Sequence, residues 1–102
     1  MKYKVILTEP ANEDLKNIAA FIAADNVDAA IKTHGKIFDA IKALQEFPDK
    51  GGHPKNKKLK AEGYRKLIID NYIALYRYSE KGKNEISIIR IFHGAMNYEK
   101  YL

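Results

Sequence analysis

Three β-rich runs in the second half of the chain are separated by turns too short for anything but antiparallel hairpins. The runs are Tyr64–Ile69, Tyr72–Tyr78 and Glu85–His93, with an Asp-Asn turn after the first and a Gly-containing turn after the second. Their β-branched and aromatic residues favour strands, and parallel strands would need a crossover of a dozen or more residues. The sequence therefore predicts a three-stranded meander.

Two helical segments precede the meander. A short strand, Tyr3–Leu7, runs into Thr-Glu-Pro at 8–10, which supplies a capping hydroxyl, an acid and a first-turn proline for one helix. A second helix is expected from about Val27 to Phe47, where a proline ends it. The predicted fold is α+β, in the order β-α-α-β-β-β: a two-helix hairpin packed on an antiparallel sheet, in one domain covering residues 1–102.

Strand alternation assigns side chains to the faces of this sheet. On the last strand Ile86, Ile88 and Arg90 share one face, and His93 lies on the other. A hairpin turn with an even number of loop residues places Arg90 on the face that carries Arg77. A one-residue bulge would reverse the assignment.

Composition excludes several classes of protein. The chain has 102 residues and no cysteine, so disulfides and thiol chemistry are absent and a reducing cytoplasm is expected. The longest apolar run, Ile18–Ala24, is far shorter than the ~20 residues of a membrane span, and the start lacks the apolar core of a signal peptide. Gly-rich phosphate loops and a nucleophilic serine with partners are missing too. We expect a soluble cytoplasmic protein without a cofactor.

The net charge of the chain is +5, and the excess of positive charge is concentrated in its second half. The basic residues between positions 50 and 66 can neutralise the phosphates of a nucleic acid, dock an acidic peptide, or form part of a solvated loop. The pattern of residues alone leaves these three interpretations open. Between residues 50 and 66 a single acid, Glu62, faces seven bases: Lys50, Lys55, Lys57, Lys58, Lys60, Arg65 and Lys66.

Histidines and strand arginines are the other candidates. His53 and His34 are expected to be a loop residue and a core-edge residue, and without cysteine or neighbouring ligands no metal site is predicted. Arginine within an apolar strand needs a partner or water. Arg77 and Arg90 could therefore bind a phosphate or an acidic partner together, or each pair with a carboxylate.

The closing stretch RIFHGAMNYEKYL brings together residue types that a ribonuclease uses. Such an enzyme needs a general base, an acid and a cation for the phosphorane charge. His93, Tyr98 or Tyr101, and arginines such as Arg65 could supply them. A structural interpretation is also open, in which Asn97 caps a last helical turn.

Three segments give the chain a family resemblance: YKVILTEPANEDLKNIAAFIA, GYRKLIIDNYIALYRY and IIRIFHGAMNYEKYL. Together they resemble the RelE/ParE superfamily of bacterial toxins from type II toxin–antitoxin modules, often labelled plasmid stabilisation proteins. The resemblance implies the β-α-α-β-β-β fold and a cognate antitoxin that binds the toxin in a hetero-oligomer. RelE-like members cut messenger RNA on the ribosome, whereas ParE-like members inhibit DNA gyrase.

The ending His93-x-x-Met96-Asn97 is similar to that of ParE-like chains. The resemblance thus implies gyrase inhibition. The alternative is RelE-like cleavage of ribosome-bound mRNA with His93, Arg65 and Tyr98 or Tyr101 as catalytic residues, and a third interpretation is a toxin fold without activity. Residues expected to bind the target or the antitoxin are Lys55, Lys57, Lys58, Lys60, Arg65, Arg77, Arg90, Met96 and Asn97.

Overall fold

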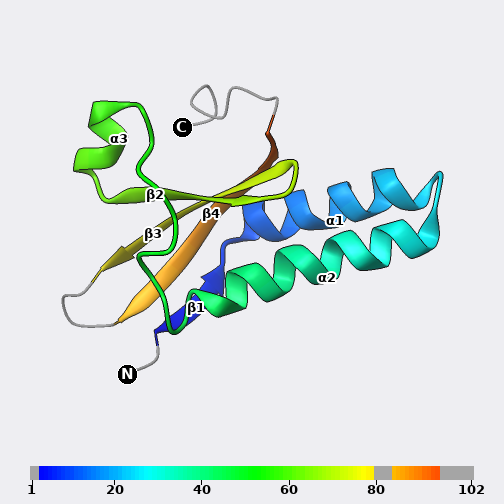
Figure 1. Ribbon diagram of the computed structural model, residues 1–102, viewed down its shortest axis with the longest axis horizontal. Helices are drawn as coiled ribbons and strands as arrows, with labels where there is room; N and C mark the ends of the chain where they lie inside the picture. Colours follow the sequence, from blue (N-terminus) through cyan, green and yellow to red (C-terminus); the bar gives the residue numbers. More distant parts are fainter. Residues whose placement is uncertain (1–2, 80–83, 95–102) are drawn as a thin grey trace.

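The computed structural model describes residues 3–79 and 84–94. Met96, Asn97, Tyr98 and Tyr101 therefore lie outside the described residues. In chain order the elements are β1 (Lys4–Leu7), α1 (Glu9–Ala23), α2 (Val27–Ala43), α3 (Lys57–Ala61), β2 (Tyr64–Ile69), β3 (Tyr72–Ser79) and β4 (Glu85–His93) (Figure 1).

The strands form one sheet in the order β1-β4-β3-β2. The predicted meander is confirmed, because β3 is antiparallel to both β2 and β4. The sheet as a whole is mixed rather than antiparallel, since β1 lies parallel to β4 with Val5 opposite Ile86. This strand has no hairpin connection to its neighbour. The chain leaves it through the helical hairpin, and that longer path permits parallel pairing.

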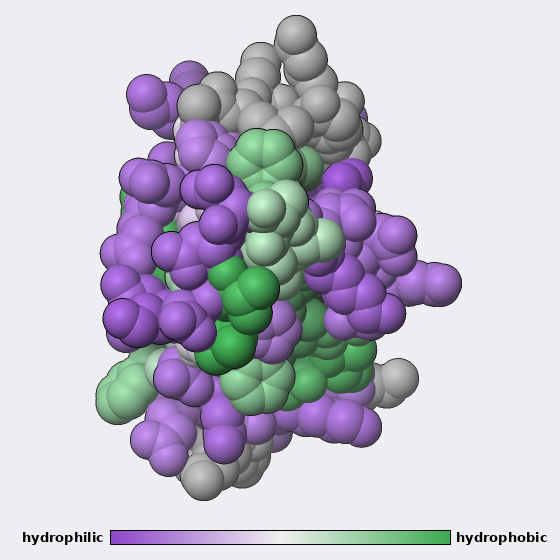
Figure 2. Space-filling model, turned by 90° about the vertical axis from the view of Figure 1, so that its right-hand side faces the viewer, coloured by the Kyte–Doolittle hydropathy of each residue, from purple (hydrophilic) through white to green (hydrophobic). Residues whose placement is uncertain are grey.

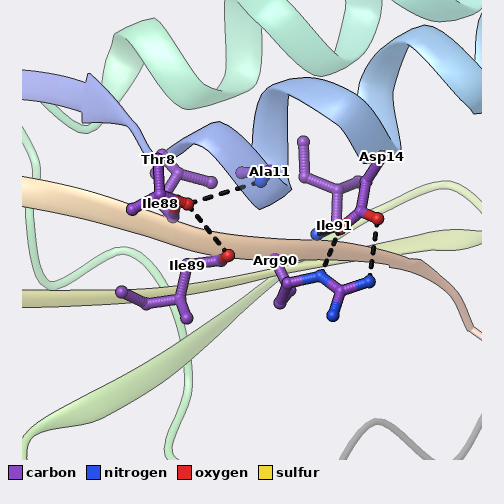
Figure 3. Close-up of polar contacts among 7 residues, drawn as sticks. All are labelled: Thr8, Ala11, Asp14, Ile88, Ile89, Arg90 and Ile91. Carbon is purple, nitrogen blue, oxygen red and sulfur yellow. Dashed lines mark hydrogen bonds and ion pairs between the residues drawn. The ribbon is translucent and has the colours of Figure 1, made fainter. Parts of the chain in front are cut away.

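The first helix begins where the sequence predicts, and its cap also joins it to the sheet. The Thr8 hydroxyl oxygen accepts a hydrogen bond from the Ala11 amide at 3.3 Å. The same hydroxyl lies 2.7 Å from the Ile88 carbonyl oxygen and 3.0 Å from that of Ile89, so its proton is donated to β4 (Figure 3). The Thr8 side chain thus caps α1 and also fixes the start of this helix against β4.

One turn further along α1, a carboxylate continues this attachment. Asp14 accepts hydrogen bonds from Nε and a terminal nitrogen of Arg90 at 2.7 and 2.9 Å, and from the Ile91 amide at 2.9 Å (Figure 3). The contacts lie beyond the last pair of β1 with β4, at Leu7 and Ile88. The start of α1 therefore follows the strand edge that β1 leaves open.

The second helix is shorter than predicted. It ends at Ala43 rather than Phe47, because the next amides bond three residues back: Leu44 to Ile41, Gln45 to Lys42 and Glu46 to Ala43. Such tight turns commonly end an α-helix.

A bulge in the last hairpin corrects part of the predicted face assignment. Leu75 is opposite Arg90, whereas Tyr76 is opposite Ile88, so the register shifts between them. Arg90 and His93 keep their predicted neighbours on β3, but Ile86 and Ile88 move to the other face and join the main core. The bulge thus reverses the assignment on one side of it only.

The core lies between the two helices and the sheet face that they cover. The helical hairpin extends well past the sheet, so its far half has no sheet beneath it (Figure 1). The core cluster contains Ala11, Leu15, Ile37, Ile41, Leu44, Leu67, Ile69, Ala74, Tyr76, Ile86, Ile88 and Ile91.

Candidate functional site

The helical hairpin exposes large apolar side chains, most of them in its far half. The exposed fractions are 84% for Phe21, 61% for Val27, 66% for Ile31 and 48% for Phe38. Figure 2 shows apolar side chains gathered over the end of the hairpin between polar flanks. Exposed apolar patches of this kind mark interaction sites in soluble proteins.

A groove of about 410 Å³ lies between α1 and α2 on this surface. The α1 side contributes only alanines, and the α2 side contributes Ala30 and three larger residues. The ring of His34 is stacked on that of Phe38, with 6.4 Å between the ring centroids. We call it the hairpin groove. This groove was not predicted from the sequence, which indicated a core-edge position for His34, whereas the His34 side chain is exposed. Its lining residues are Ala19, Ala20, Ala23, Val27, Ala30, Ile31 and His34.

The second surface is basic and lies at the other end of the molecule. We call residues 50–66 the basic platform. No helix was predicted here from the sequence, but the segment contains α3. Asn56 Oδ1 caps this helix by accepting hydrogen bonds from the Lys58 and Leu59 amides at 2.9 and 3.1 Å. Leu59 packs inward, and the helix turns its charged residues outward. The exposed lysines are Lys50, Lys55, Lys57, Lys58 and Lys60.

A fully buried tyrosine anchors the platform to the sheet. Tyr76 donates from its hydroxyl to the Pro48 carbonyl at 2.6 Å and accepts from the Gly51 amide at 2.9 Å. Burial raises the pKa of Tyr76 above its ordinary value of 10.0. Gly52 and Lys66, on the outer edge of β2, also exchange two backbone hydrogen bonds.

Arg65 belongs to the same anchor. Its guanidinium donates to the Gly51 carbonyl at 2.8 Å and lies 3.6 Å from the Asp49 carboxylate. Its side chain therefore fixes the start of the platform.

Arg77 and Arg90 have different environments. Arg90 is paired with Asp14, as described above, which supports the structural alternative for this residue. Arg77 is exposed, and its guanidinium carbon lies 5.2 Å from the centroid of the Tyr64 ring, a cation–π distance. Arg77 on β3 is opposite Ser87, and Arg90 on β4 is opposite Leu75, so the bulge lies between these two pairs.

His93 is exposed at the end of β4, and its ring lies edge-on to Tyr72 at 5.6 Å. In register, His93 is opposite Tyr72 while Arg65 is opposite Tyr76, on the other neighbour of β3. Four residues along a strand span about 13 Å and two strand spacings about 10 Å. The structure thus keeps these two residues, predicted to act together in RNA cleavage, well apart.

No group of three or more His, Asp or Glu side chains that could hold a metal ion occurs within residues 3–79 and 84–94. His53 is exposed in the platform. Among the helices that the structure describes, none is both long and apolar enough to span a bilayer.

Solved structures of similar fold place this arrangement among bacterial toxins. A chromosomal ParDE toxin–antitoxin system from P. aeruginosa matches with a TM-score of 0.70 and 26% identity, over 90% of this chain and 96% of that one. The RelBE2 toxin–antitoxin complex from Mycobacterium tuberculosis matches with a TM-score of 0.60 and 25% identity, over 91% and 99%. No curated protein sequence matches the chain.

The fold is therefore that of the RelE/ParE toxin superfamily. Within it, residues 5–98 match the family model described as the ParE toxin of the parDE type II toxin–antitoxin system. The chain belongs to this ParE family and is the toxin of a type II toxin–antitoxin system.

Proposed function

We propose that this toxin arrests bacterial growth by inhibiting DNA gyrase and that its cognate antitoxin neutralises it. Membership of the ParE family is the observation that carries the proposal. The position of Arg65 adds support, because its guanidinium is bound to Gly51 and Asp49 and its strand position is distant from His93. A general base and a cation that act on one phosphate must lie within a few ångströms of it.

The hairpin groove is the proposed docking site of the antitoxin. Alanines on α1 let another helix approach closely, while Val27 and Ile31 supply apolar contact from α2. An amphipathic helix laid into an apolar groove is a recurring mode of protein recognition. Both solved relatives come from toxin–antitoxin systems, which supports a protein partner of this kind.

For the target, Met96 and Asn97 remain the proposed contacts at the end of the chain, and His93 remains the catalytic candidate of the RelE-like alternative. The lysines and arginines predicted from the sequence stay candidates for target or antitoxin binding. Arg65 and Arg90 have structural contacts of their own, so the proposal gives the greater weight to Arg77 and the lysines: Lys55, Lys57, Lys58 and Lys60.

Two parallel assays test the proposed function. Purified toxin is added to a gyrase supercoiling reaction, and separately to ribosomes carrying a messenger RNA. We expect supercoiling to fall with toxin concentration and to recover when antitoxin is added, with the RNA intact. A toxin truncated after Ala95, which lacks Met96 and Asn97, should leave supercoiling unchanged. Unchanged supercoiling together with cleaved RNA that depends on His93 would establish the RelE-like alternative instead.

A further inference from the structure

The basic platform lies apart from the hairpin groove, the proposed docking site of the antitoxin, and it carries five exposed lysines. Lys50, Lys55, Lys57, Lys58 and Lys60 are exposed, and within residues 3–79 and 84–94 none of them forms an ion pair with a carboxylate. On the hairpin, by contrast, Lys36 pairs with Asp70 at 3.1 Å. Like charges gathered without counter-charges repel one another, so an anionic ligand would stabilise this surface.

These lysines project from a fixed support. The Tyr76 hydroxyl, the Arg65 guanidinium and the Gly52–Lys66 bridge tie residues 48–52 to the sheet. Leu59, only 8% exposed, packs the inner side of α3. Because the main chain is already ordered, a ligand that binds the lysines pays only for ordering their side chains.

The charged surface continues from α3 onto the sheet. Gly63 joins α3 to β2, and a Cβ added to it would lie 4.0 Å from Arg77 Nε, so the end of α3 is next to Arg77. The Arg77 guanidinium lies over the Tyr64 ring. Lys66 is two residues beyond Tyr64 on the same strand and shares its face. Cationic residues beside a partly exposed aromatic ring are typical of nucleic-acid-binding surfaces.

The chemistry of this surface favours a nucleic acid over an acidic protein. Protein interfaces rely on a buried apolar or aromatic centre, and none of the exposed large apolar side chains in the described residues falls within 50–66. Phosphate backbones need only correctly placed cations. We propose that the basic platform, with Arg77 and Tyr64, binds the phosphodiester backbone of a nucleic acid without reading its sequence.

This binding is measured without gyrase or ribosomes, so its outcome is independent of the proposed toxin target. Full-length purified toxin is titrated into labelled duplex DNA, single-stranded DNA and RNA of unrelated sequences, and fluorescence anisotropy is followed over a series of salt concentrations. The form that binds most tightly identifies the ligand. Non-specific binding of this type has a Kd of about 10⁻⁴–10⁻⁶ M at physiological salt.

The decisive variant is Lys57→Gln/Lys58→Gln/Lys60→Gln, because it removes three charges from the exposed side of α3. The matched control, Lys16→Gln/Lys32→Gln/Lys42→Gln, removes three exposed charges from α1 and α2. Circular dichroism verifies that both variants are folded.

We expect the platform variant to bind at least about tenfold more weakly at low salt, with a slope of log K against log salt reduced by about 2 to 3, since each phosphate contact contributes about 0.9. The control should change affinity by less than about threefold. Equal losses in the two variants, no binding to any nucleic acid, or binding to polyglutamate alone would each overturn the proposal.

Discussion

The two exposed surfaces of this toxin differ in what holds them in place and in what they offer. The hairpin groove is formed by two long helices that extend past the sheet and leave alanines, Val27 and Ile31 without an apolar cover. The basic platform is a loop with one short helix, held to the sheet by Tyr76 and Arg65. Apolar contact area selects a protein, whereas ordered charge selects a polyanion. The described residues thus present two chemically distinct surfaces, for which we propose different partners.

The largest effect is expected in the hairpin groove. Ile31→Asp places a carboxylate where the antitoxin's apolar residues would pack, and an unpaired buried charge is costly. We predict that affinity for the antitoxin falls at least about 100-fold, close to 3 kcal/mol, in isothermal titration calorimetry. Because Ile31 is mostly exposed in the toxin, the variant should still fold.

Lys32→Asp is the matched control for this variant. It adds the same carboxylate one residue further on, about 100° around α2, at an exposed position outside the groove. A loss of affinity in Lys32→Asp as large as that in Ile31→Asp would show that charge rather than the groove decides binding.

The platform depends on close packing at Gly51. A Cβ on this residue would lie 2.6 Å from the Tyr76 ring and 2.7 Å from the Lys66 carbonyl oxygen. We predict that Gly51→Ala lowers the free energy of unfolding by about 2 kcal/mol, as overpacking usually does, measured by urea denaturation.

Gly52 provides the adjacent comparison. A Cβ there meets nothing within 4 Å, so Gly52→Ala should stay within about 0.5 kcal/mol of the unmodified toxin. Equal stability of the two variants would contradict the role assigned to the Tyr76 anchor.

The attachment of α1 to β4 should contribute less. Asp14 is partly buried and accepts three hydrogen bonds from Arg90 and Ile91. Its side chain retains 15% exposure and that of Arg90 28%, so solvent screens the pair. We predict that Asp14→Ala costs about 1.5 kcal/mol in urea denaturation, while Glu13→Ala, at an exposed position, has little effect. Equal losses would exclude a specific contribution from the pair.

The smallest effect concerns pH. Burial raises the pKa of Tyr76 in the folded state above 10.0, so between that value and the raised pKa the folded chain holds a proton that the unfolded chain has lost. The stability that this group contributes is full below pH 10 and is lost as pH rises through the folded pKa. We predict that stability above pH 10 falls less steeply in Tyr76→Phe than in the unmodified toxin. Parallel curves would contradict this.

The sequence predicts the elements of this fold well because local signals specify them. Thr8 and Pro10 give the start of α1, and the turns give the limits of β2 and β4 as observed. Two features depend on contacts distant in sequence and were not predictable in this way. One is the parallel pairing of β1 with β4; the other is the bulge that moves Ile86 and Ile88 into the main core.

The surfaces were predictable to different degrees. Charged residues are evident in any sequence, so the lysines of the platform were predicted directly. The contacts that hold the platform to the sheet were not, because the Tyr76 hydroxyl meets the Gly51 amide only in the folded chain. The hairpin groove was missed because periodicity marks residues as apolar without showing where the sheet beneath them ends. Arg65 was predicted as a catalytic candidate from its residue type, and its contacts with Gly51 and Asp49 form only in the folded chain.

The separation of the two surfaces is tested most directly by nuclear magnetic resonance of the isotopically labelled toxin. Amide shifts are recorded once with unlabelled antitoxin and once with a short nucleic acid. We predict that the antitoxin shifts the amides that line the hairpin groove, and that the nucleic acid leaves these unchanged and shifts those of residues 50–66 and Arg77. The account is contradicted if the antitoxin leaves the groove amides unshifted, or if both ligands shift the same residues.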